Sequence, residues 1–159
     1  DSGFCNDLTY YSFNTSGWNK DYSNYDKWLN FGSRQRLDDR KLSLVCPRQL
    51  DKFSVSADNG NGKLTYPVGM ITAEEITIAG AVIWQTNTSY YLYNGVNNWS
   101  LSPSYFHTWV AYEFTLRSSG DFNNYYVTGS LGARPSISLK QGTVLSSGNG
   151  TSASPFIVN

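Results

Sequence analysis

The stretch MITAEEITIAGAVI (residues 70–83) carries the clearest local structural signal in the chain. Thr72 can cap a helix through its hydroxyl, and Glu75, three residues later, can reach back to the backbone of the cap. Ile76 begins a series of apolar residues at helical spacing, so one face of the helix is expected to pack on a core. These features predict one principal helix near residues 73–83.

Short runs in which apolar and polar residues alternate predict strands on both sides of this helix. The runs are KLSLVCP (41–47), KFSVSA (52–57), YYLY (90–93), WSLS (99–102), WVAYEFTLRSSG (109–120), GARPSISLK (132–140) and SPFIV (154–158). Residues 1–50 otherwise mix aromatic residues with turn formers and indicate short N-terminal strands and loops. Because the connections are short, the strands should be mainly antiparallel, and the sequence predicts the α+β class.

The run at residues 109–120 shows the period of two most clearly. One face would carry Val110, Tyr112, Phe114 and Leu116, and the other Trp109, Ala111, Glu113 and Thr115. We expect the first group to pack mostly inside, together with Trp84 and Leu92. The run therefore predicts a strand with one buried face.

The composition is that of one folded domain with balanced charge. The 159 residues are 40% hydrophobic and 16% aromatic, which is enough for a single core, and we take residues 1–159 as one domain. Twelve basic residues balance twelve acidic ones, so we expect no binding to nucleic acid. No run of 18 apolar residues occurs, so we expect no membrane insertion of this domain.

The two cysteines of the chain are Cys5 and Cys46. They lack the neighbouring Cys or His residues of a zinc site, which needs four ligands. A disulfide between them would close a loop of roughly forty residues and restrict the unfolded chain by about 3 to 4 kcal/mol. We expect this bridge to hold residues 1–50 in place. Because disulfides form in oxidising compartments, we also expect an extracellular location. Two buried free thiols are the alternative.

Residue types that catalysis needs are present without a supporting pattern. His107 could serve as a base for Ser102 or Ser104, but no Gly-x-Ser-x-Gly turn occurs. Glu113 or Asp121 could orient that base. Paired carboxylates for glycoside cleavage could come from Asp38, Asp39, Glu74, Glu75, Glu113 and Asp121. Glu74 and Glu75 are better explained by the first turn of the helix. We therefore expect no enzymatic activity and no catalytic residue.

DNGNGK (58–63) favours a tight turn through its two Asn-Gly pairs. It also resembles a calcium-binding loop, but it lacks the alternating carboxylates and the downstream Glu of an EF-hand. We expect no metal and no cofactor in this domain.

Four segments occur in an order known from one fold family. YPVGMITAEEITIAGA (66–81) is similar to an LPTEAEWEYAA segment in which a strand end leads into a capped helix. NNWSLSPS (97–104), VAYEFTLRSSG (110–120) and GARPSISLK (132–140) resemble successive segments of bacterial surface domains. GNGTSASPFIV (148–158) is similar to the closing strand of pilin-associated proteins. Together these segments resemble the C-type-lectin-like and formylglycine-generating-enzyme-like fold family.

The resemblance implies a C-type-lectin-like fold used as a binding module. The copper-dependent oxygenases of the family use cysteines near the C-terminal end, whereas both cysteines here precede residue 47. The sulfoxide synthases bind iron through several histidines, and this chain has only His107. The calcium-binding triplets of the sugar-binding lectins are absent, and NWS (98–100) lacks their carboxylate. The resemblance therefore implies recognition without these chemistries.

The family also includes proteins diversified by retroelements, whose ligand surfaces are rich in Asn, Tyr and Ser. Residues 85–131 hold twelve aromatic residues, six Asn and seven Ser against three charged side chains. We predict that this is the ligand-binding region, because Tyr and Trp give large contact areas and Asn and Ser adapt their hydrogen bonds. The side chains expected in its turns and connections are Tyr93, Asn94, Asn97, Asn98, Trp99, Ser104, Tyr105, Phe106, His107, Trp109, Asn123, Asn124, Tyr125 and Tyr126.

The sequence thus predicts an extracellular ligand-binding domain, an adhesin or receptor-binding module of a bacterial surface, pilus-tip or phage-type protein. Its partner would be a protein or glycan of a host or neighbouring cell. The alternative is a structural pilus or surface-layer subunit whose aromatic residues pack against neighbouring copies. Arg134 in GARP is expected to make a structural ion pair or carbonyl contact.

Overall fold

The computed structural model describes residues 3–14, 17–19, 29–55, 60, 62–107, 110–151 and 153–159. The helices in this part of the chain are α1 (Gly32–Asp38), α2 (Ala73–Ile78) and the 3-10 helix η1 (Gln49–Asp51). The strands are β1 (Gly3–Cys5), β2 (Tyr10–Asn14), β3 (Gly17–Asn19), β4 (Leu29–Phe31), β5 (Lys52–Ser54), β6 (Gly62–Lys63), β7 (Val68–Met70), β8 (Asn98–His107), β9 (Val110–Leu116), β10 (Phe122–Tyr126), β11 (Gly132–Ala133), β12 (Pro135–Ile137), β13 (Leu145–Ser147) and β14 (Ile157–Val158).

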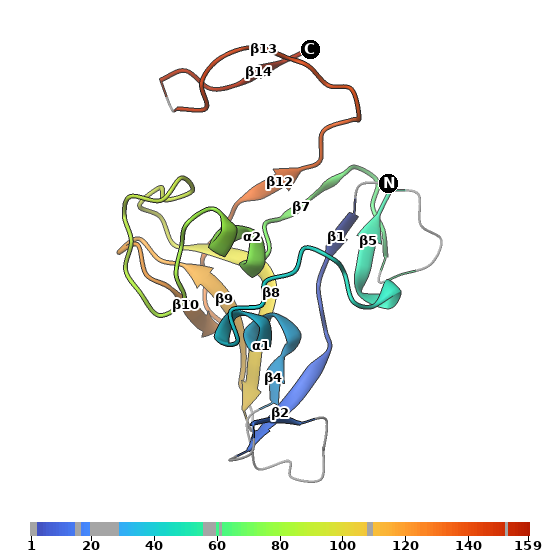
Figure 1. The fold of residues 1–159 in the computed structure, drawn as a ribbon, viewed down its shortest axis with the longest axis vertical. Coiled ribbons are helices and arrows are strands. Elements are labelled where there is room, and N and C mark those ends of the chain that lie inside the picture. Colours follow the sequence, from blue (N-terminus) through green and yellow to red (C-terminus); the bar gives the residue numbers. More distant parts are fainter. Residues whose placement is uncertain are drawn as a thin grey trace.

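A seven-stranded sheet forms the body of the structure, in the order β10-β9-β8-β4-β2-β3, with β11 also paired to β8 (Figure 1). The long strand β8 is its centre, because β9 pairs along one edge while β4 and β11 pair with opposite ends of the other. Only β11 runs parallel to its neighbour in this sheet. The predicted α+β class with mainly antiparallel strands is confirmed.

The hydrophobic core lies between this sheet and the two helices. Its buried members are Leu37, Ala73, Ile76, Ala81, Tyr90, Phe114, Leu116 and Phe122. Phe114 and Phe122 come from the adjacent strands β9 and β10 and pack with their ring centroids 5.5 Å apart. Phe114 and Leu116 are buried as predicted, because the alternation of β9 turns them toward the helices.

Helix α2 begins where the sequence predicts. The hydroxyl of Thr72 accepts a hydrogen bond from the backbone N–H of Glu75, and the Glu75 carboxylate accepts one from the backbone N–H of Thr72. The predicted end near residue 83 is wrong, because the helix stops at Ile78. Gly80 follows with a φ of 112°, a left-handed conformation that ends the helix, and its carbonyl accepts a hydrogen bond from the Asn87 side chain.

Helix α1 was not predicted, so the expectation of one principal helix is wrong. It lies within residues 1–50, where only strands and loops were expected. Its N-cap is Phe31, which makes no side-chain capping bond, so no local signal marks its start. The contacts that hold α1 come from distant segments, as the ion pairs of Arg36 show below.

Two predicted strands are wrong. Residues 41–47 form no strand, and the apolar side chains of this run are exposed, with Val45 at 77%. Residues 90–93 form a turn closed by a hydrogen bond from the Tyr93 N–H to the Tyr90 carbonyl. Apolar and polar residues alternate in both segments, but neither segment has a neighbouring strand to pair with among the described residues. Trp84 is also more exposed than predicted, at 42%, and has a φ of 64°.

The predicted disulfide between Cys5 and Cys46 is present. It joins β1 to the segment that follows α1, across a separation of 41 residues. This bond is compatible with an extracellular location. In the part of the chain that the structure describes, no helix has the length and apolar character needed to span a membrane.

The last two strands, β13 and β14, form a separate hairpin (Figure 1). This hairpin lies beyond β12, apart from the seven-stranded sheet. Its large apolar side chains are exposed: Val144, Leu145, Phe156, Ile157 and Val158. The hairpin therefore presents apolar surface away from the core.

Candidate ligand-binding site

The strands β8, β9 and β10 divide their side chains between two faces of the sheet. In the register of these strands Trp99 lies opposite Thr115, and Thr115 lies opposite Asn123. Glu113 lies opposite Tyr125. Residues directly opposite each other on antiparallel strands share a face, so these five side chains define one face, here called the pocket face. The core residues lie on the other face.

A pocket of about 350 Å³ opens on the pocket face. Its lining residues are Asn97, Thr115, Arg117, Tyr125, Gly129, Ser130 and Leu131. They come from the end of β9, from β10 and from the segments that precede β8 and β11. The pocket therefore gathers polar side chains and one aromatic ring from segments far apart in the sequence.

The ring of Tyr125 is held in place by its neighbours. The guanidinium carbon of Arg117 lies 5.7 Å from the ring centroid, and the Trp99 and Tyr125 centroids are 6.5 Å apart. Gly129 packs so closely that a Cβ atom there would lie 2.5 Å from the Tyr125 ring. These contacts order a half-exposed tyrosine and present it as a wall of the pocket.

Arg117 supplies the positive charge of the pocket. Its Nη2 donates a hydrogen bond of 2.9 Å to the carbonyl of Asn124. Its nearest carboxylate is Asp121, at 3.9 Å from Nε, which is too long for a hydrogen bond. Because a guanidinium has five N–H donors, Arg117 keeps donors for a further acceptor.

Thr115 is fully buried and lines the pocket. Its hydroxyl has no hydrogen-bond partner among the residues that the structure describes. An unpaired buried hydroxyl costs about 1 to 3 kcal/mol of stability. Asn97 lines the same pocket, and its side-chain amide oxygen accepts a hydrogen bond from the backbone N–H of Ser118. A ligand hydroxyl can bond directly to the Asn97 amide, whereas the covered Thr115 hydroxyl becomes available when a side chain of the pocket lining moves aside.

Glu113 lies beside this pocket on the same face. Burial raises the pKa of its carboxyl from 4.5 to about 7. The group is therefore partly protonated near neutral pH, which reduces the negative charge on the pocket face.

The structure brings some of the predicted ligand residues together at this pocket. Asn97 and Tyr125 line it, and Trp99 and Asn123 share its face. Asn123 and Tyr125 were expected in connections between elements, but they belong to the strand β10. Trp109 lies outside the described residues.

The other predicted residues lie elsewhere. Ser104, Tyr105, Phe106 and His107 were expected in a connection, but they continue the strand β8. Ser104 and Tyr105 are buried, so their predicted exposure is wrong. Asn124 and Tyr126 are strand residues of β10, not turn residues, and their register partners lie on the opposite face. The Tyr126 ring nevertheless contacts the Tyr125 ring, with 5.4 Å between the centroids.

A row of three tyrosines crosses that opposite face. Tyr105 stacks on Tyr112 at 4.1 Å between ring centroids, and Tyr112 contacts Tyr126 at 4.7 Å. These pairs lie directly opposite each other in the sheet register. Tyr105, Tyr112 and Tyr126 are therefore joined by cross-strand packing, which stabilises a sheet.

Two further predicted residues stabilise the loop before β8. Asn98 is buried and donates hydrogen bonds to the side chain of Asn94 and the carbonyl of Val96. Tyr93 donates its hydroxyl to the Ser118 carbonyl at 2.8 Å. Arg134 donates a hydrogen bond to the Leu92 carbonyl, which confirms the expected carbonyl contact.

Sequence reasoning missed five of the seven residues that line the pocket. Thr115, Arg117, Gly129, Ser130 and Leu131 were not predicted as site residues. The sequence carried a signal for two of these five residues. Arg117 is one of only three basic residues after residue 70, and the period of two already placed Thr115 on the face opposite the core.

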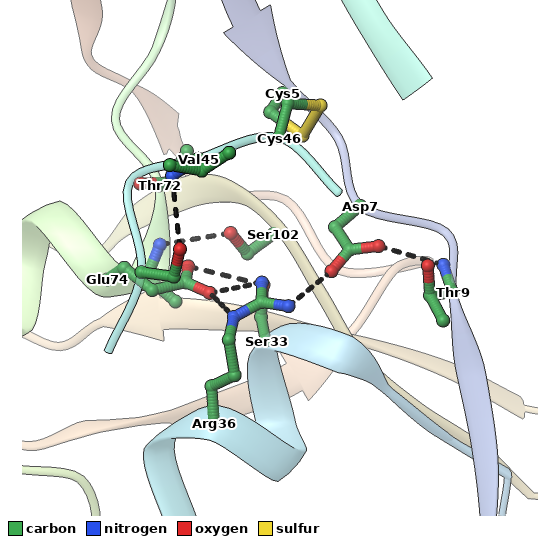
Figure 2. Close-up of polar contacts among 12 residues, drawn as sticks. Cys5, Asp7, Thr9, Ser33, Arg36, Val45, Cys46, Thr72, Glu74 and Ser102 are labelled. Atoms are coloured by element: carbon green, nitrogen blue, oxygen red, sulfur yellow. Dashed lines mark hydrogen bonds and ion pairs between the residues drawn. A yellow bond between two sulfur atoms is a disulfide. The ribbon is translucent and has the colours of Figure 1, made fainter. Parts of the chain in front are cut away.

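A second cluster of charged groups joins α1, α2 and the N-terminal segment (Figure 2). The guanidinium of Arg36 bridges Asp7 and Glu74, and Ser33 donates a hydrogen bond to Glu74. Burial lowers the pKa of Arg36, but the charges and hydrogen bonds of Glu74 and Asp7 outweigh burial and raise it overall. Each group has an ionic partner, so this cluster fixes the packing of α1 against α2.

No family model matches the chain, and neither the curated proteins nor the solved structures include a match to it. Within the described residues, no three or more His, Cys, Asp or Glu side chains gather in a group that could hold a metal ion.

Proposed function

We propose that the chain is an extracellular recognition domain with a C-type-lectin-like fold, carried by a bacterial surface, pilus-tip or phage-type protein. It binds a protein or glycan of a host or neighbouring cell through the pocket face. It acts by recognition and carries out no chemical reaction.

The observation that supports this proposal is the combination of an ordered aromatic wall with unpaired polar groups in one pocket. Tyr125 is half-exposed and fixed by Arg117, Trp99 and Gly129. Thr115 offers a buried hydroxyl without a partner at the same place. Ligand sites combine such apolar walls with a few placed polar groups. The disulfide supports an oxidising compartment outside the cell.

The test compares two tyrosines, one in the pocket and one outside it. The domain is screened on arrays of cell-surface glycans and cell-surface proteins, and each partner found is measured again with Tyr125→Ala and Tyr66→Ala. Tyr125→Ala should weaken binding at least tenfold, whereas Tyr66→Ala should change it less than twofold, because Tyr66 is exposed and does not line the pocket. Melting temperatures identify any variant that has lost its fold. Equal losses in both variants would refute this binding face.

A structural subunit of a pilus or surface layer is the second candidate, and one observation favours it. The β13–β14 hairpin exposes five large apolar side chains, including Phe156 and Ile157. An isolated two-stranded hairpin is only marginally stable in water, so contact with a neighbouring copy would stabilise this one.

Light scattering over a range of protein concentrations separates the two candidates. A mass that rises with concentration in the wild type and stays monomeric in Ile157→Lys would favour the structural subunit. A monomer at all concentrations would favour recognition through the pocket face.

A further inference from the structure

The pocket has a particular pattern of free polar groups. Arg117 contributes N–H donors, since only its Nη2 bond to the Asn124 carbonyl is within hydrogen-bond distance of a described residue. Thr115 lines the pocket and contributes a buried, unpaired hydroxyl. Asn97 and Ser130 line the pocket as well, and Tyr125 adds a ring face. The pocket thus offers one cation, one aromatic surface and several uncharged hydrogen-bonding groups.

We propose that this pocket binds an acidic monosaccharide unit of a glycan. The sugar carboxylate pairs with Arg117, the sugar ring packs against Tyr125, and sugar hydroxyls bond to Thr115, Asn97 and Ser130. This inference rests on the proposed recognition function and names its ligand class.

The single guanidinium of the pocket, from Arg117, is the reason that we expect the sugar to carry a carboxylate. A planar guanidinium matches a carboxylate through two parallel hydrogen bonds. Asp121 lies 3.9 Å from Arg117 and accepts a hydrogen bond from the Asn123 side chain at 3.0 Å, so it is not tightly bound to the guanidinium. A ligand carboxylate can therefore take the free donors. One cation balances one negative charge, which favours a carboxylate over a doubly charged phosphate.

The uncharged groups of the pocket are the reason that we expect the ligand to be a sugar. A sugar ring carries hydroxyl groups around its edge and C–H groups on its faces. Thr115 and Asn97 approach such an edge, while the ring of Tyr125 provides the apolar contact for a face. An acidic peptide side chain would use Arg117 but would leave the Thr115 hydroxyl unpaired. The pocket therefore favours an acidic sugar over an acidic peptide.

The experiment measures the affinity of the folded chain for matched sugar pairs by calorimetry. The pairs are galacturonic acid with galactose and glucuronic acid with glucose, and N-acetylneuraminic acid is tested as a third acid. A peptide rich in Glu and Tyr is the competitor. The variants are Arg117→Gln, Arg117→Lys and Thr115→Val. Lys140→Gln is the matched control, because it removes one positive charge from an exposed residue that does not line the pocket.

At least one of the three acidic sugars should bind ten times more tightly than its neutral reference. The reference is the matched neutral sugar for the two uronic acids and galactose for N-acetylneuraminic acid. Arg117→Gln should abolish this preference, Arg117→Lys should retain part of it, and Lys140→Gln should retain it fully. Thr115→Val should weaken the acid and the neutral sugar by a similar factor. An Arg117→Gln variant that melts far below the wild type leaves Arg117→Lys and Thr115→Val as the deciding comparisons.

Equal affinity for acidic and neutral sugars would overturn the inference while leaving the recognition function intact. Tighter binding of the acidic peptide than of any acidic sugar would also overturn it. Binding of no sugar, while array partners still depend on Tyr125, would reject the sugar and keep the face. Array partners that ignore Tyr125 would reject the face itself.

Discussion

Tyr125 and Tyr126 are consecutive residues of β10 whose register partners, Glu113 and Tyr112, lie on opposite faces of the sheet, yet the two tyrosine rings meet at the sheet edge with 5.4 Å between their centroids. Tyr125 lines the pocket and contacts Trp99 and Arg117. Tyr126 packs on Tyr112 in the tyrosine row. One strand thus supplies a residue for recognition and a residue for sheet packing, and the composition of residues 85–131 alone cannot separate these roles.

Thr115→Val should raise stability and lower binding at the same time. The substitution keeps the shape of the side chain and removes a buried hydroxyl that has no partner among the described residues. We expect the free energy of unfolding to rise by about 1 kcal/mol, measured by urea denaturation. Binding of the array partners should fall in the same variant. A loss of stability would show that the hydroxyl is paired in solution.

Gly129→Ala should weaken binding without removing any polar group. The added Cβ would lie 2.5 Å from the Tyr125 ring, so the ring has to move. We expect a loss of binding of at least threefold, measured by calorimetry with an array partner. Ser130→Ala, next in the chain, keeps the Tyr125 ring in place and should show a smaller loss. Unchanged affinity in Gly129→Ala would mean that the ring position is unimportant.

Glu113 should make the stability of the domain depend on pH. Its pKa is about 7 in the folded chain and near 4.5 when exposed, so the folded state holds the proton more tightly. The stabilisation is complete below about pH 4.5 and is lost as the pH rises to 7. We expect a loss on the order of 2 kcal/mol, reduced for partial exposure to solvent.

Glu113→Gln tests this dependence, because the amide stays neutral. The variant should match the wild type in urea denaturation at pH 4.5 and exceed it in stability at pH 8. Parallel curves for the two proteins between these values would contradict the raised pKa.

Arg36→Met should strongly destabilise the fold. The substitution leaves the carboxylates of Asp7 and Glu74 buried without their cation, and breaking such a buried pair costs about 3 to 5 kcal/mol. Arg34→Met is the matched control on the same helix, because Arg34 is as exposed as Arg36 but its partner Asp38 is 28% exposed, against 3% for Asp7 and 4% for Glu74. Losing this ion pair and the contact of Arg34 with the Trp84 ring should cost about 1 to 2 kcal/mol. Thermal unfolding measures both. Equal losses would remove the special role of the Arg36 cluster.

Local signals made part of the fold predictable. The capping pair of Thr72 and Glu75, a signal only four residues long, determines where α2 begins. The alternation of β9 determines which of its side chains face the core. Both depend on neighbours in the sequence. The end of α2 depends on the turn at Gly80, and α1 depends on Arg36 reaching Asp7 and Glu74 from distant segments. These non-local contacts leave little trace in the sequence pattern.

The candidate site was predictable to a similar degree. Tyr125 and Asn97 were found through their residue types, which suit recognition surfaces. Tyr105 has the same residue type but is buried in the tyrosine row, because the register of β8 against β9 turns it toward Tyr112. Thr115 becomes part of the site only through the pocket that the segment before β11 encloses.

The most direct test of recognition through the pocket face is to map which residues a bound partner covers. Backbone amide signals of the labelled domain are followed by NMR while the strongest array partner is added. If the partner binds at the pocket face, the largest shifts occur at Asn97, Arg117, Tyr125 and Ser130, with little change at Tyr105 or Ile157. Shifts centred on the β13–β14 hairpin, with none at the pocket, would contradict recognition through the pocket face.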